Sequence, residues 1–128
     1  MRNRATIVKS KPKVVVIEDD IVFANLLELS LRNNGYDAYI IATAKEAIDF
    51  IPASKGVDLF IVDYDLGDVK SNGLDLCRKI KAYAHKPVVM LTGETSTDTT
   101  VACLYAGADQ YVLKPYDLKE LLARIHSA

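Results

Sequence analysis

The sequence has few of the residues that mark several common classes of protein. It contains two cysteines and two histidines among 128 residues, and none has the spacing of a metal site. Cys77 and Cys103 fall in helix-like stretches, so we expect free, buried thiols and no disulfide. Residues 1–13 lack the apolar core of a secretory signal, and no apolar run is long enough to span a bilayer. We therefore expect a cytoplasmic protein that does not enter a membrane.

Strong charge of either sign is also lacking. The formal net charge is −1 at pH 7, which gives no general attraction to nucleic acid or to a membrane surface. The first thirteen residues nevertheless hold five of the 16 basic residues and none of the 17 acidic ones. We expect a flexible basic arm over residues 1–12 and one domain over 13–128, without direct nucleic-acid binding by that domain. The acidic remainder suits a cation site better than a bare anion site.

Short apolar runs and amphipathic stretches alternate along the chain. The runs predict strands over residues 13–17, 37–42, 57–63, 87–91 and 109–113. Helices are predicted over about 20–34, 43–52 and 97–106, and also from residue 73 and after residue 117. In the helix that follows Gly73, Leu76, Ile80 and Tyr83 are predicted to share one buried face. Five strands that alternate with helices predict an α/β fold with a parallel sheet.

The predicted strands end in polar residues of complementary chemistry. Glu18 and Asp19 follow the first strand, Asp63 ends the third, and Thr92 and Lys114 follow the fourth and fifth. Because the carboxyl ends of parallel strands share one edge of the sheet, these side chains should converge. Carboxylate oxygens favour Mg²⁺, and a carboxylate beside Mg²⁺ can act as a nucleophile toward phosphorus. Lys114 and Thr92 offer an ammonium and a hydroxyl to phosphate oxygens.

Four segments resemble the receiver domain of two-component response regulators. They are VVVIEDD, LFIVDYDLG, PVVMLTG and GADQYVLKPYDLKELLARI, and the resemblance covers about residues 13–126. It implies a three-layer (βα)5 flavodoxin-like fold, a doubly wound parallel sheet with strand order 2-1-3-4-5. It also implies a phosphorylation-dependent signalling switch. Such a domain is no enzyme in the usual sense, since it phosphorylates itself from phosphohistidine and slowly loses the phosphate.

The resemblance assigns a role to each residue at the strand ends. Asp63 accepts the phosphoryl group from a sensor histidine kinase or a histidine phosphotransfer protein. Glu18, Asp19, Asp63 and the backbone carbonyl of Asp65 bind Mg²⁺. Lys114 contacts the acyl phosphate, and the Lys114–Pro115 peptide bond is expected to be cis.

The resemblance also implies a switch. Thr92 follows the phosphoryl oxygen, and Tyr111 changes rotamer with it. Asp65 and Glu94 occupy positions that tune the loss of phosphate. The surface of the fourth helix, fifth strand and fifth helix then controls an output domain or a protein partner.

Departures from the family pattern leave alternatives open. The loop over residues 66–72 is long and has Gly67 where a proline is usual. The fourth helix is almost uncharged, and Gln110 stands where dimerising relatives have an acid, so we do not expect their ion-paired dimer. A homodimer of another kind stays open. Two other functions are an aspartate-nucleophile phosphatase, since Asp63-Tyr64-Asp65 resembles a DxD pair, and a degenerate receiver that binds partners without phosphorylation.

Overall fold

One parallel sheet organises the computed structural model, which describes residues 11–67 and 72–128. The strand order is β2-β1-β3-β4-β5, with all four pairings parallel. The strands are β1 (Lys13–Ile17), β2 (Asp37–Ile41), β3 (Leu59–Asp63), β4 (Val88–Thr92) and β5 (Gln110–Leu113). This confirms the predicted fold class and strand order.

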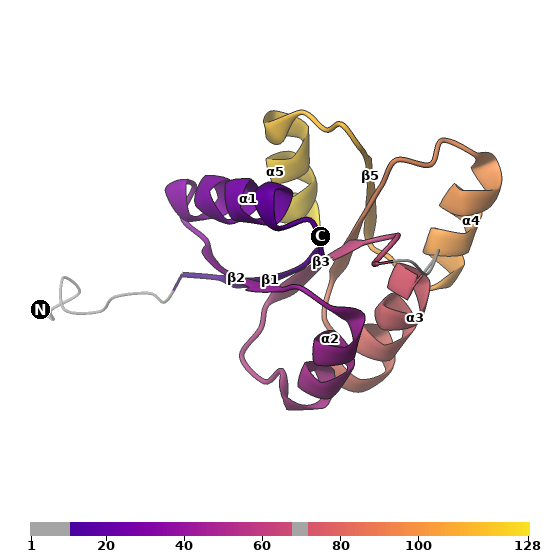
Figure 1. Ribbon diagram of the computed structural model, residues 1–128, viewed down its shortest axis with the longest axis horizontal. Helices are drawn as coiled ribbons and strands as arrows, with labels where there is room; N and C mark the ends of the chain where they lie inside the picture. Colours follow the sequence, from indigo (N-terminus) through magenta and orange to yellow (C-terminus); the bar gives the residue numbers. More distant parts are fainter. Residues whose placement is uncertain (1–10, 68–71) are drawn as a thin grey trace, which may run out of the picture.

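Helices cover both faces of the sheet, which gives three layers (Figure 1). The helices are α1 (Ile21–Asn33), α2 (Ala44–Phe50), α3 (Asn72–Lys79), α4 (Thr97–Tyr105) and α5 (Leu118–Ser127), with a 3-10 turn η2 (Ile51–Ala53) and a π turn η3 (Ile80–Ala84). α1 and α5 pack on one face, and α2, α3 and α4 lie on the other. No helix of the described residues is long and apolar enough to cross a bilayer.

Alternating side chains of the central strand build the two cores. Every residue of β3 is buried. Phe60 and Val62 pack into the core beneath α2 and α3, whereas Leu59 and Ile61 face α1 and α5. A fully buried aliphatic or aromatic side chain contributes about 1.5–3 kcal/mol, so β3 supports both layers at once. The strand therefore holds its terminal residue, Asp63, on a rigid support.

Side-chain caps begin four of the helices. Asp20 Oδ1 accepts the Phe23 N–H at 3.1 Å before α1, as the acidic run Glu18-Asp19-Asp20 allows. Thr43 caps α2 through the Glu46 N–H at 3.1 Å, and its hydroxyl contacts Glu46 Oε1 at 2.9 Å. Ser96 caps α4 and Asp117 caps α5 in the same way. Such a cap stabilises a helix by about 1 kcal/mol.

Two sequence predictions need correction. β3 begins at Leu59, two positions after the predicted start, since Val57 closes a turn onto the Ser54 carbonyl. Tyr83 is 68% exposed, whereas Leu76 and Ile80 are buried as predicted. The π turn η3 causes this difference, because its wider spacing rotates Tyr83 off the buried face.

The remaining predictions about the chain concern its thiols and its irregular segments. Cys77 and Cys103 are free and buried, as predicted, and burial raises the pKa of Cys77 to about 12 and that of Cys103 to about 11. Residues 1–10 of the expected arm and residues 68–71 of the long loop lie outside the described residues.

Candidate phosphorylation site

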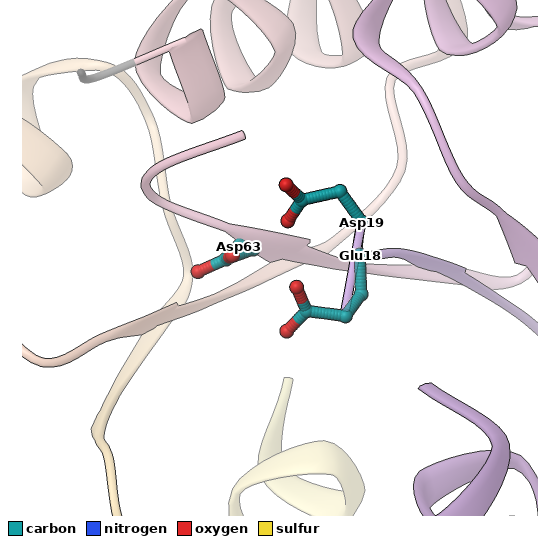
Figure 2. Close-up of side chains that lie close together, drawn as sticks. All are labelled: Glu18, Asp19 and Asp63. Atoms are coloured by element: carbon teal, nitrogen blue, oxygen red, sulfur yellow. The ribbon is translucent and has the colours of Figure 1, made fainter. Parts of the chain in front are cut away.

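Three carboxylates meet at the carboxyl ends of β1 and β3. Glu18 and Asp19 directly follow β1, and Asp63 is the last residue of β3. Figure 2 shows their side chains around one small space. Their carboxylate oxygens lie within 4.8 Å of one another. Glu18 is 1% exposed and Asp63 7%, while Asp19 is exposed, so this acidic cluster reaches from the interior to the surface.

Backbone hydrogen bonds hold the cluster in place. The Glu18 N–H donates to the Ile41 carbonyl at 3.1 Å, which keeps the residue after β1 against β2. Glu18 Oε2 accepts the Asp20 N–H at 3.2 Å, and Asp19 Oδ2 accepts the Gly67 N–H at 2.8 Å. The second of these bonds ties the turn after β3 to the end of β1. Asp65 lies in that same turn and is half-buried.

Lys114 joins two of the carboxylates. Its Nζ lies 2.9 Å from Glu18 Oε1 and 3.1 Å from Asp63 Oδ1. Its backbone N–H donates to the Thr92 carbonyl at 2.7 Å, which places the residue at the end of β5 beside β4. The Lys114–Pro115 peptide bond is cis, the conformation that the family resemblance implies.

The charges in this cluster shift one another's protonation. Burial raises the pKa of Glu18 to about 7, against the hydrogen bond from Lys114 that lowers it. Burial also raises the pKa of Asp63, and hydrogen bonds from Glu18 and Lys114 oppose that rise. For Lys114, burial alone would lower the pKa, but its bonds to Glu18 and Asp63 raise it overall. One ammonium therefore does not fully offset the burial of Glu18 and Asp63, and a further cation would favour the ionised forms of these two carboxyls.

Thr92 and Tyr111 are connected through the loop after β4. Thr92, at 1% exposure, ends β4, and its Oγ1 accepts the Glu94 N–H at 3.0 Å. The Glu94 carbonyl accepts the Tyr111 hydroxyl at 2.7 Å. These two bonds place Glu94 between the residues for which the resemblance implies a switch. A continuous chain of two hydrogen bonds therefore runs from Thr92 to Tyr111.

Two features of the site were not identified in the sequence. The ring centroid of Phe23 lies 4.6 Å from Lys114 Nζ, a cation–π contact, and the Tyr116 ring packs edge-on against Phe23. Gly73, in the first turn of α3, lies directly against the end of β3, and its N–H donates to the Tyr64 carbonyl at 2.9 Å. A Cβ on Gly73 would overlap the Asp63 carbonyl oxygen and lie 2.8 Å from Tyr64 Cα. A glycine at a helix start was the one available signal for this contact.

The site can be compared with known families. A family model described as the response regulator receiver domain matches residues 14–126. The chain belongs to the response regulator receiver family. Receiver domains are not enzymes that turn over a separate substrate, so the match argues against the phosphatase alternative. The acidic cluster Glu18, Asp19 and Asp63 is consistent with the phosphorylation site of a receiver.

Curated relatives support this assignment. The chain is 35% identical over 117 residues to the DNA-binding response regulator MtrA of Mycobacterium tuberculosis H37Rv. The aligned region covers 91% of this chain and 50% of MtrA. The chain is 37% identical over 114 residues to the response regulator ArlR of Staphylococcus epidermidis RP62A, covering 89% and 51%. The chain thus spans about half the length of the curated relatives it matches.

Solved receiver structures share the fold. A CheY-like receiver domain protein from Methanospirillum hungatei superposes with a TM-score of 0.82 at 29% identity, covering 92% of this chain and 93% of that one. A response regulator receiver protein from Pseudomonas putida superposes with a TM-score of 0.82 at 31% identity, covering 94% and 100%.

Proposed function

We propose that this receiver domain, residues 13–128, is a phosphorylation-dependent switch in a His–Asp phosphorelay. Asp63 accepts a phosphoryl group from the phosphohistidine of a sensor kinase or of a histidine phosphotransfer protein. The observation that carries this proposal is the contact of Lys114 with both Glu18 and Asp63 beside a third carboxylate, Asp19. One carboxylate oxygen of Asp63 forms the new P–O bond while the P–N bond of the donor breaks.

The donor set of the acidic cluster fits Mg²⁺. Carboxylate oxygens of Glu18, Asp19 and Asp63 would hold the ion, and the backbone carbonyl of Asp65 would add a fourth ligand. The bound ion would supply positive charge where the phosphoryl oxygens collect. The Gly67 N–H orients Asp19, and Lys114, which already contacts Asp63, would hold a phosphoryl oxygen.

Thr92, Glu94 and Tyr111 would transmit the change. When the Thr92 hydroxyl turns toward a phosphoryl oxygen, it gives up the Glu94 N–H, and the Glu94 carbonyl no longer holds the Tyr111 hydroxyl in place. Reversing a two-state equilibrium from 1:99 to 99:1 takes about 5.5 kcal/mol. Charge-assisted hydrogen bonds contribute about 1.5–3 kcal/mol each, so new bonds from Thr92 and Lys114 supply energy of this order. We infer that Asp65 and Glu94 set how water reaches the acyl phosphate.

Two exposed apolar surfaces would serve the partners. Val22, Leu26 and Leu29 form a stripe on the outer side of α1, which begins beside the acidic cluster, and a helix of the phosphohistidine donor could bury it. On the opposite face of the sheet from α1, Leu104 and Tyr105 of α4 are exposed, and the surface of α4, β5 and α5 would control the output. We propose that both contacts are made in the cytoplasm. Any homodimer would use apolar rather than ion-paired contacts.

The direct test is chemical phosphorylation. Acetyl phosphate or phosphoramidate with Mg²⁺ should add one phosphoryl group, detected by intact mass, and chelation of Mg²⁺ should prevent the addition. Asp63→Asn should abolish the adduct. Asp58→Asn is the matched control, because Asp58 lies just before the opposite end of β3, and this variant should be phosphorylated normally.

Three results would contradict the proposal. An adduct that survives in Asp63→Asn would place the phosphate elsewhere. Turnover of a phosphate monoester would indicate a phosphatase. No adduct with either donor would indicate a receiver that works without phosphorylation.

A further inference from the structure

A pocket of about 300 Å³ lies on the α2 side of the sheet, next to the edge strand β2. Val15 of β1 and Tyr39 and Ile41 of β2 form its floor, and Phe50 and Val57 form its walls. Tyr39 is 45% exposed, so α2 does not cover this part of the sheet completely. None of the three carboxylates of the acidic cluster lines the pocket. The volume is at the lower end of the range for small-molecule sites.

The charged side chains that line this pocket are basic. Lys13 and Lys55 line it, both are exposed, and neither forms an ion pair with another described residue. Two of the described carboxylates, beside the pocket, accept hydrogen bonds from backbone and hydroxyl groups and form no ion pair with these lysines. Asp58 Oδ2 accepts the Lys13 backbone N–H at 2.8 Å, and Asp37 accepts the Tyr39 hydroxyl at 2.9 Å. An apolar hollow with two lysines at its rim complements a ligand that has an apolar body and one negative charge.

We propose that this pocket binds a small apolar carboxylate, with its hydrocarbon part on the sheet and its charge between Lys13 and Lys55. The basic N-terminal residues are a poor alternative occupant, because Arg2, Arg4 and Lys9 would be repelled by the two lysines.

A strand of a second copy is also a poor fit for this side of the sheet. The Arg32 guanidinium donates to the Ala38 carbonyl on the outer side of β2 and so occupies part of the edge that such a strand would need. The site is independent of phosphoryl transfer, so Asp63→Asn should not alter it.

Octanoate and octylammonium form a matched pair of probes, since they share an apolar chain and differ in the sign of the charge. Each is titrated at constant ionic strength into the full ¹⁵N-labelled chain. We expect octanoate to shift the amide resonances of Val15, Ile41 and Val57 with a Kd of about 1 mM, as a weak ligand of about ten heavy atoms allows. Octylammonium should bind at least about tenfold more weakly, because both lysines repel it.

Three variants locate the site. Lys55→Gln should raise the Kd for octanoate about fivefold, a typical effect for one surface charge. Lys86→Gln is the matched control, because Lys86 lines the neighbouring hollow and not this pocket, and it should leave the Kd unchanged. Ala53→Phe should abolish the shifts by filling the pocket. Ala53 is exposed, so this variant should keep the wild-type melting temperature.

Several outcomes would overturn the proposal. Equal affinities for octanoate and octylammonium would show that the lysines do not contribute to binding. Amide shifts confined to α1 or α4 would show that the ligand binds outside this pocket. Absence of shifts at several times the expected Kd would show that the pocket is not a site. A rise in octanoate affinity in Ile7→Ser would indicate that the N-terminal residues occupy the pocket. A dimer in sedimentation that Ala53→Phe dissociates would indicate a second copy there.

Discussion

Replacing Gly73 by alanine tests the contact between the start of α3 and the residue proposed to carry the phosphate. Gly73 lies in the first turn of α3, where alanine is normally the better residue. Helix propensity and the lower entropy of the unfolded chain would together make Gly73→Ala stabilising by about 1 kcal/mol. The contact of Gly73 with the backbone of Asp63 and Tyr64 predicts instead that the substitution is destabilising.

The added Cβ has no free space. It would overlap the Asp63 carbonyl oxygen and lie 2.8 Å from Tyr64 Cα, and both are backbone atoms that cannot rotate away. Overpacking of this kind costs about 1–3 kcal/mol. Any shift of α3 that relieves this overlap also weakens the 2.9 Å bond from the Gly73 N–H to the Tyr64 carbonyl, which adds about 1 kcal/mol. We expect a net loss of about 2 kcal/mol once the propensity gain is subtracted.

Urea denaturation at neutral pH measures this loss, and the melting temperature should fall by about 6 °C. Gly93→Ala is the matched control, because a Cβ there meets no atom within 4 Å and the backbone is not left-handed. Its stability should stay the same or rise by about 0.5 kcal/mol. The initial rate of acetyl phosphate labelling should also fall in Gly73→Ala, since Asp63 would be displaced. A Gly73→Ala variant as stable as the wild type would refute the reasoning.

Three further predictions concern the same edge of the sheet. Lys114→Gln should destabilise the metal-free protein by about 3 kcal/mol in urea titrations at pH 7, because it leaves two buried carboxylates without their cation. Lys119→Gln, at an exposed position of α5, should have no such effect. Without Mg²⁺, stability should fall by up to about 3 kcal/mol as the pH rises from 4.5 to about 7, because the folded state holds the Glu18 proton that the unfolded chain releases. Excess Mg²⁺ should flatten this slope, and an unchanged slope would contradict metal binding by Glu18. Tyr111→Phe should lower the free energy of unfolding by about 1 kcal/mol through loss of the bond to the Glu94 carbonyl, and an unchanged stability would contradict that bond.

Much of the site could be predicted because it depends on topology. Glu18, Asp63 and Lys114 stand at the ends of different strands, and a parallel sheet places those ends on one edge whatever the details of packing. The helix caps Thr43 and Asp117 were also predictable, because a cap depends on residues three or fewer positions away.

Other features of the chain depend on contacts that sequence spacing does not record. Tyr83 has the spacing of a core residue, yet the π turn η3 exposes it. In the sequence, Phe23 looks like any other apolar residue of α1. Its contact with Lys114 depends on how α1 packs near the end of β5. The pocket beside β2 exists because α2 leaves part of the sheet uncovered, and no local pattern predicts that gap.

The sequence by itself determined the fold class, the strand order through the family resemblance, and the chemistry at the strand ends. Local periodicity and residue type suffice for the fold class and for the residues at the strand ends, because strands are short-range structures, whereas the strand order rested on the resemblance. Only the tertiary structure decided that Lys114 contacts both Glu18 and Asp63, that Glu94 links Thr92 to Tyr111, and that α3 leaves no room beside Asp63. Most of those contacts join residues far apart in the chain, and a displacement of about 1 Å would break a hydrogen bond, so they depend on how the layers pack.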